Sequence, residues 1–126
     1  MKQEEFENLV EQAVKDLPEE IRKKIENVAI LVEAKPTEEQ LRKTGIRYGG
    51  FLLGLYEGIP QTTWGKGFGG NLPDKITIFQ GSIENLASAT AEIKEVVKTV
   101  VWHEIAHHFG IGEKEVRKLE QKWNLK

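Results

Sequence analysis

Residues 103 to 113 read His-Glu-Ile-Ala-His-His-Phe-Gly-Ile-Gly-Glu, and this stretch indicates a helix that carries a metal site. His103 and His107 are four residues apart, so on an α-helix their side chains share one face, with Cβ atoms roughly 5–6 Å apart. Two imidazoles at that separation can bind one Zn²⁺. Glu104 lies beside the same face, where it can deprotonate a metal-bound water without ligating the metal. The spacing is the H-E-x-x-H pattern of zinc metallopeptidases, which also occurs by chance in unrelated proteins.

A catalytic zinc usually has three protein ligands, so a third is expected near the two histidines. Gly110 lies three residues past His107, where a helix end favours a residue that tolerates left-handed backbone angles. A chain that turns at Gly110 can fold back over the site, and Glu113 is the next side chain able to ligate. Glu115 and Glu120 are also carboxylates and remain alternatives for this third position.

The periodicity of apolar residues predicts an α+β domain in which short strands lie between helices. Helical spacing is expected at 3–16, at 18–25, in the metal-site helix 92–109 and at 114–123, and Ser82 is expected to cap a further short helix. Residues 36–44 fit either a turn of helix with Thr37 as its cap or a solvated loop. Strands are expected at 28–33, 49–57 and 74–80, with Gly54 marking a bulge or a close approach of the backbone.

Composition limits the classes of function. The chain of 126 residues is long enough for one domain, spanning residues 1–126. A net charge of −2 gives no reason to expect nucleic acid or an anionic membrane as partner. The absence of cysteine excludes disulfides, thiolate ligands and a cysteine nucleophile. A charged N-terminal segment without an apolar core predicts a cytoplasmic protein.

Three segments resemble the small bacterial zincin-like metallopeptidases, the "minimal zincin" family. They are Leu53-Gly-Leu-Tyr-Glu-Gly-Ile-Pro60, Leu72-Pro-Asp-Lys-Ile-Thr-Ile-Phe79 and Val101-Trp-His-Glu-Ile-Ala-His-His-Phe-Gly-Ile111. The resemblance implies a minimal zincin-like fold, a short mixed β-sheet packed on an active-site helix with N- and C-terminal helices. By position it implies zinc ligands His103, His107 and Glu113 and the general base Glu104. The family has aspartate more often where this chain has Glu113.

The resemblance also implies that an extended peptide pairs with an exposed sheet edge just before the metal-site helix. That position points to Thr77, Ile78 and Phe79, although the same residues also fit an ordinary half-buried strand. The hydrogen-bond donor that stabilises the oxyanion of the reaction has three candidates that the sequence does not rank, Tyr56, Tyr48 and His108. Trp64 and Phe68, in a glycine-rich stretch at 58–73, are candidates for a flap over the substrate.

These observations predict a zinc-dependent peptidase in which a zinc-bound water attacks the peptide carbonyl and Glu104 accepts its proton. The expected cofactor is Zn²⁺ and the expected partner is a peptide or protein in an extended conformation. The alternative is a non-catalytic module that binds zinc and a peptide at its edge strand. Structural zinc sites are usually closed, with four ligands and many cysteines, so the pattern here favours catalysis.

Overall fold

The computed structural model describes residues 1–44, 52–58 and 73–123, apart from the side chains of Glu113 and Trp123. The elements, in chain order, are α1 (Gln3–Lys15), α2 (Glu19–Lys24), β1 (Val28–Glu33), α3 (Glu38–Thr44), β2 (Gly54–Glu57), β3 (Asp74–Phe79), α5 (Gln80–Glu84), α6 (Thr90–His108) and α7 (Glu113–Trp123). None of the helices in these ranges is both long enough and apolar enough to cross a membrane.

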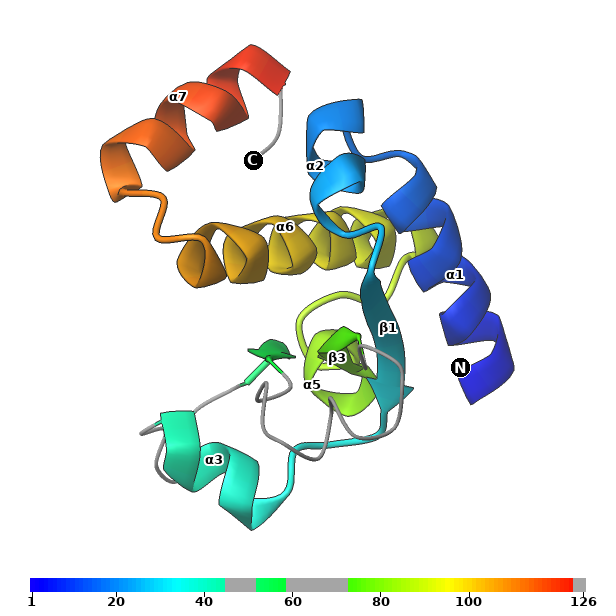
Figure 1. Ribbon diagram of the computed structural model, residues 1–126. Helices are drawn as coiled ribbons and strands as arrows, with labels where there is room; N and C mark the ends of the chain where they lie inside the picture. The colour runs from blue at the N-terminus through cyan, green and yellow to red at the C-terminus, as the bar shows by residue number, and fades with distance from the viewer. Residues whose placement is uncertain (45–51, 59–72, 124–126) are drawn as a thin grey trace.

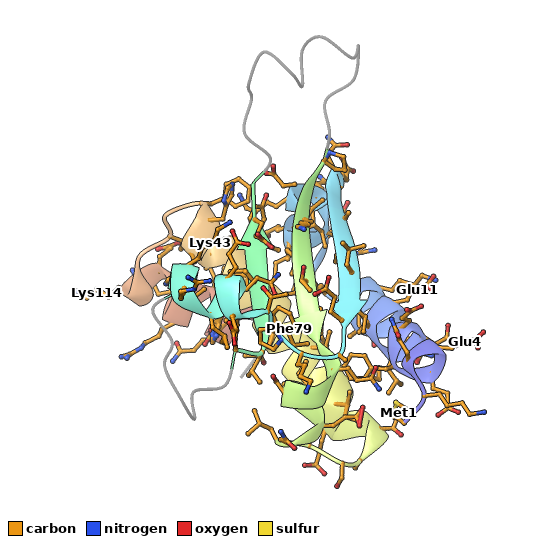
Figure 2. All side chains as sticks on the ribbon, turned by 90° about the horizontal axis from the view of Figure 1, so that it is seen from below. Met1, Glu4, Glu11, Lys43, Phe79 and Lys114 are labelled. Carbon is orange, nitrogen blue, oxygen red and sulfur yellow. The ribbon has the colours of Figure 1, made fainter. Side chains whose placement is uncertain are left out.

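The three strands form one mixed sheet in the order β1-β3-β2. β1 runs parallel to β3, and β2 runs antiparallel to it, so that Thr77 has Leu31 on one side and Leu55 on the other. Figure 2 shows the three strands side by side, with β3 in the middle. The prediction that Thr77, Ile78 and Phe79 form an exposed edge is therefore wrong, because both sides of β3 already carry a neighbouring strand.

Helix α6 is the central packing element. It contacts α1, α5, β2 and β3, and its apolar face is buried in the core. Figure 1 shows α6 running between the strands on one side and α7 on the other. The buried residues of α6 follow the helical spacing that the sequence predicts, and they are Ile93, Val97, Val100, Val101, Trp102, Ile105 and Ala106. This burial fixes the direction in which the opposite face of α6 points.

A local sequence signal explains where α3 begins, whereas the signal expected for α5 does not. At α3, the backbone N–H of Gln40 donates to the Thr37 hydroxyl (3.1 Å), and the Thr37 N–H donates to the Gln40 side chain (2.9 Å). This reciprocal pair of hydrogen bonds is a capping box. Of the two alternatives for this segment, a helix and a solvated loop, residues 38–44 therefore form the helix. The predicted Ser82 cap is wrong: α5 begins directly after β3 with Phe79 as its N-cap, and Ser82 lies inside the helix.

Candidate metal centre

The two histidines of the HExxH pattern lie on the solvent-facing side of α6 and open into one cavity. The His103 side chain is 53% exposed, and His107 is exposed as well. The cavity has a volume of about 550 Å³, and its walls come from α6, α7 and the turn between them. It is lined by His103, Glu104, Ala106, His107, Ile111, Val116, Arg117 and Glu120. The polar face of α6 and the first two turns of α7 therefore enclose the predicted site.

The turn at Gly110 brings α7 back over this face. Gly110 has a φ of 67°, in the left-handed region that favours glycine. Its N–H donates to the His107 carbonyl (3.2 Å), and the Ile111 N–H donates to the Ala106 carbonyl (2.8 Å). These two hydrogen bonds define a Schellman motif, the usual way for a helix to end at glycine. The predicted reversal at Gly110 is confirmed, and α7 turns back along α6 (Figure 1).

Glu104 is fixed by a contact with the sheet. Its Oε1 accepts a hydrogen bond of 2.9 Å from the backbone N–H of Tyr56 in β2. Burial raises the pKa of Glu104 above its ordinary value, while the Tyr56 N–H and the nearby His107 and His103 act in the opposite direction. The carboxylate is therefore both oriented and made more basic, and these are the two properties that a general base needs.

Tyr56 and His108 meet at a second cluster beside this contact, together with Asp74. The Tyr56 hydroxyl donates to Asp74 Oδ2 (2.7 Å), and the Tyr56 ring stacks on the His108 ring at 3.9 Å between centroids. His108 Nε2 lies 3.9 Å from the same Asp74 oxygen. Burial and the hydrogen bond to Asp74 raise the pKa of Tyr56 to about 12. The hydroxyl is thus engaged with Asp74 rather than with the histidine cavity.

The three carboxylates considered as third ligand lie at different places on α7. Glu113 is the first residue of the helix, and its side chain lies outside the described atoms. Glu115 is exposed. Glu120 reaches the site: its Oε1 lies 3.0 Å from His103 Nε2. Among the side chains that the structure describes, no three from histidine, aspartate and glutamate are close enough to hold a metal ion as they stand.

Some residues at the site carry no recognisable sequence signal. Arg117 lines the cavity from α7, and Asp74 anchors Tyr56 from the first position of β3. The Trp102 side chain is fully buried, and its Nε1–H donates to Glu120 Oε1 at 3.1 Å. A buried tryptophan N–H usually has an acceptor, but the sequence around Trp102 does not identify Glu120 as that acceptor. Tyr48, Trp64 and Phe68 lie outside the described residues.

A larger hollow, of about 640 Å³, lies between α1 and β1. Its titratable lining consists of Glu7, Glu11, Lys15 and Glu33, without a histidine. The smaller cavity is therefore the candidate site, because imidazole and carboxylate groups line it together. Imidazole and carboxylate are ordinary zinc ligands, and the exposed His103 and His107 side chains can turn within an open cavity. The donor set of this cavity thus fits zinc, although a change of side-chain conformation must accompany binding.

Comparison with known proteins identifies the family and the fold. The model of the zincin-like metallopeptidase family matches residues 25–123. A solved structure of a conserved hypothetical protein from T. thermophilus is similar, with a TM-score of 0.56 and 27% sequence identity. The similarity covers 86% of this chain and 94% of that protein. No curated protein gives a significant match to the sequence. The sheet and helices described above therefore correspond to a minimal zincin-like fold.

Proposed function

The chain belongs to the zincin-like metallopeptidase family, and from this premise we propose that it is a zinc-dependent peptidase whose general base is Glu104. One observation carries the proposal. Glu104 lies in the same cavity as His103 and His107 and is held there by the backbone of β2. A half-buried carboxylate that is oriented beside two exposed histidines and has a raised pKa supports a role in proton transfer.

The proposed zinc ligands are His103 and His107, with a carboxylate of α7 as the third. When bound, zinc supplies a Lewis acid that makes water nucleophilic near neutral pH. By family position the carboxylate is Glu113, whereas among the described side chains of α7 Glu120 contacts His103. Both belong to α7, so the proposal requires α7 to close one side of the site.

In the proposed mechanism, Glu104 moves the proton. Its Oε1 is occupied by the Tyr56 N–H, which leaves Oε2 to accept the proton from the attacking water. The same oxygen can then deliver that proton to the leaving amine. Glu104 is therefore again an unprotonated carboxylate at the end of the cycle. The raised pKa of Glu104 supports this role because a more basic carboxylate holds the transferred proton better. Tyr56 contributes through its main chain, whichever group stabilises the oxyanion.

The proposed substrate is a peptide in extended conformation, and the sheet topology favours β2 as the strand that it pairs with. β2 is an edge strand, and among the strands it contacts α6 most extensively. The Leu53 carbonyl accepts from the Phe79 N–H, so odd-numbered residues of β2 face β3. The backbone groups of Gly54 and Tyr56 therefore point away from β3, toward α6 and the site. The Tyr56 N–H is already donated to Glu104, so a peptide along this edge would pair through the other backbone groups of Gly54 and Tyr56 and would lie beside Glu104.

The substitution Glu104→Gln tests the proposal. We expect the variant to keep its fold and one zinc per chain but to hydrolyse peptides at least about 10²-fold more slowly, the scale of a general-base contribution. The measurement is cleavage of a diverse peptide library by the zinc-loaded protein, with zinc content determined in parallel. Glu92→Gln is the matched control, because Glu92 is an exposed glutamate in the first turn of the same helix.

Two results would contradict the proposed function in different ways. Unchanged hydrolysis in Glu104→Gln would remove Glu104 from the mechanism. A wild-type protein that binds one zinc but cleaves nothing in the library would make the non-catalytic zinc- and peptide-binding module the better description.

A further inference from the structure

We propose that the hollow between α1 and β1 is a docking groove for an extended, basic segment of a partner protein, which adds to the sheet beside β1. The residues that line this groove are different from those that line the metal cavity, so the inference does not rest on the proposed function. The family model matches residues 25–123, so α1, which forms one wall of the groove, lies outside the matched segment.

The first observation is that β1 is an outer strand of the sheet over the residues that the structure describes. Its sequence, Val-Ala-Ile-Leu-Val-Glu, has neither the proline nor the lysine that commonly protects such an edge, and its register with β3 runs without a bulge. Leu31, in the middle of the strand, is 43% exposed. Figure 2 shows β1 on the side of the sheet nearer α1, with Glu11 of α1 beyond its outer edge. An apolar edge of this kind is a template for a further strand.

The register of the sheet shows which backbone groups of β1 lie at this edge. The Phe79 N–H donates to the Leu53 carbonyl, so odd-numbered residues of β3 face β2, and even-numbered ones such as Ile76 face β1. In a parallel pair, the residue opposite one that bonds across the pair points its own N–H and C=O the other way. Ile30 lies opposite Ile76, so both backbone groups of Ile30 point away from β3.

Two hydrogen bonds to partners outside the sheet agree with this orientation. The Val28 N–H donates to the Ile25 carbonyl (3.0 Å), and the Val32 carbonyl accepts from Gln3 Nε2 of α1 (3.4 Å). Between these two bonds, the Val28 C=O, the two groups of Ile30 and the Val32 N–H also point away from β3. An added strand would bond to alternate residues of β1 in this way.

The groove has room for such a strand because α1 packs mainly on α6. Its volume is about 640 Å³. Val10 and Val14 of α1 provide apolar surface on one wall, and Ile30, Leu31 and Val32 provide it on the other. Side chains of an extended segment could therefore bury apolar surface against both α1 and β1.

The charge of the groove indicates what kind of segment fits it. Three carboxylates, those of Glu7, Glu11 and Glu33, line it together with one ammonium group, that of Lys15. Lys15 Nζ is already paired with Glu11 (3.3 Å), and Glu7 accepts from the neutral amide of Gln3 (3.1 Å). Glu7 and Glu33 thus keep negative charge on opposite walls. Lysine or arginine next to apolar residues would complement both walls.

The same charges disfavour a second copy of this chain as the occupant. A two-fold contact brings the same surface patch of both copies together. Pairing β1 with β1 would therefore place the carboxylates of Glu7, Glu11 and Glu33 close to their own counterparts, and like charges at such short range are repulsive.

The first experiment measures binding of fluorescein-labelled peptides of about eight residues by anisotropy, at low salt. The full chain is used without added zinc, so that no peptide is hydrolysed. A peptide in which lysine alternates with valine should bind at least about 10-fold more tightly than one in which glutamate alternates with valine. Glu7→Gln/Glu33→Gln should weaken binding of the lysine peptide about fivefold. Glu4→Gln/Glu26→Gln, with the same charge change at exposed positions outside the groove, should stay within about twofold.

The second experiment tests strand addition itself. With the lysine peptide bound, amide hydrogen exchange followed by NMR should slow at least about 10-fold at Ile30 and Val32, whose N–H groups face the groove. The amide of Leu31, which faces β3, should change little. N-methylation of one set of alternate peptide residues should abolish binding, and N-methylation of the other set should not, because only one set faces β1.

Three results would overturn the proposal. They are equal affinity for the glutamate peptide, a loss of less than about twofold in Glu7→Gln/Glu33→Gln, and unchanged exchange at Ile30 and Val32 with the lysine peptide bound. A dimer in sedimentation experiments that Leu31→Lys dissociates would also overturn it, because a second copy would then occupy the groove. Far-UV circular dichroism checks that each variant is folded.

Discussion

At the scale of single residues, Tyr56 joins the proposed general base to the rest of the site. Its backbone N–H orients Glu104, and its side chain is fixed between His108 and Asp74. A main-chain contact can be made by any residue type except proline, so no pattern of amino acids could have predicted it. The sequence offers the Tyr56 hydroxyl as one of three unranked candidates for the oxyanion donor, and in the structure this hydroxyl donates to Asp74.

The bond to Asp74 predicts an unusual titration. We expect Tyr56 to ionise with a pKa of about 12 in the folded protein, compared with an ordinary value near 10, because burial and the Asp74 carboxylate disfavour the phenolate. The folded state therefore holds the phenolic proton more tightly than the unfolded state. The resulting stabilisation is complete below about pH 10 and is lost as the pH rises through about 12.

Absorbance at 295 nm measures this titration directly. The chain has two tyrosines, so a Tyr48→Phe background leaves Tyr56 as the only phenol. Asp74→Asn in that background should lower the midpoint, because the hydrogen bond partner loses its charge while burial remains. An ordinary midpoint near 10, in protein that circular dichroism shows to be folded, would mean that the contact between Tyr56 and Asp74 does not persist in solution.

At the scale of elements, Gly54 allows β2 to lie against α6. A Cβ atom at this position would overlap Cγ1 of Val100 and would lie 3.2 Å from the Thr77 carbonyl oxygen. The close approach that the sequence predicts at Gly54 is confirmed. Because Tyr56 follows two residues later in the same strand, the spacing between β2 and α6 also sets where the Tyr56 N–H meets Glu104.

Gly54→Ala should therefore destabilise the protein. Overpacking of this kind typically costs about 1–3 kcal/mol of unfolding free energy, and chemical denaturation measures it. The double variant Gly54→Ala/Val100→Ala should be less destabilised than the sum of its parts, because the second change removes the overlapping methyl group. Gly112→Ala is the control, since a Cβ there has no neighbour within 4 Å. Strict additivity of Gly54→Ala and Val100→Ala would show that the two elements are not in contact at this point.

The elements that the sequence predicted best are those whose burial is periodic. The helices α1, α6 and α7 follow from apolar spacing, because one face of each packs on the core. The strand 28–33 follows instead from its compact run of apolar and β-branched residues. Strand order was not predictable in the same way. Residues 76–79 are buried on both faces, and such a run indicates a central strand. The prediction that Thr77, Ile78 and Phe79 form an exposed edge came instead from the family resemblance.

The candidate metal site shows a similar difference between what local spacing predicts and what it does not. His103, Glu104 and His107 line one cavity, which agrees with the i, i+4 spacing of the histidines on one helix face and with Glu104 beside that face. The sequence could not rank Glu113, Glu115 and Glu120, because their distance from the histidines depends on how α7 returns after Gly110. That return is set by tertiary contacts such as the bond between Trp102 and Glu120, which no local spacing records.

At the scale of the whole molecule, the cavity lies between α6, which crosses the core, and α7, which packs on it from one side. Ligands from both helices would make the metal a cross-link between the core and α7. Anything that binds only the folded state stabilises it by mass action, and free zinc at 100 times its dissociation constant would add about 2.7 kcal/mol. This stabilisation by zinc should be largest in the segment that the metal would link to the core, because the chain alone lacks that contact.

We therefore predict that zinc raises the midpoint of thermal unfolding by roughly 10 °C at that concentration and slows amide hydrogen exchange in α7 more than in α1. Both candidate carboxylates, Glu113 and Glu120, belong to α7, so the expectation does not depend on which one ligates. Calorimetry measures the midpoint, and exchange followed by mass spectrometry of peptides locates the protection. The His103→Ala/His107→Ala variant is the control and should show neither effect. Zinc that raised the midpoint while leaving α7 unprotected would place the third ligand elsewhere in the chain. In that case α7 would be a lid over the cavity rather than part of the metal site.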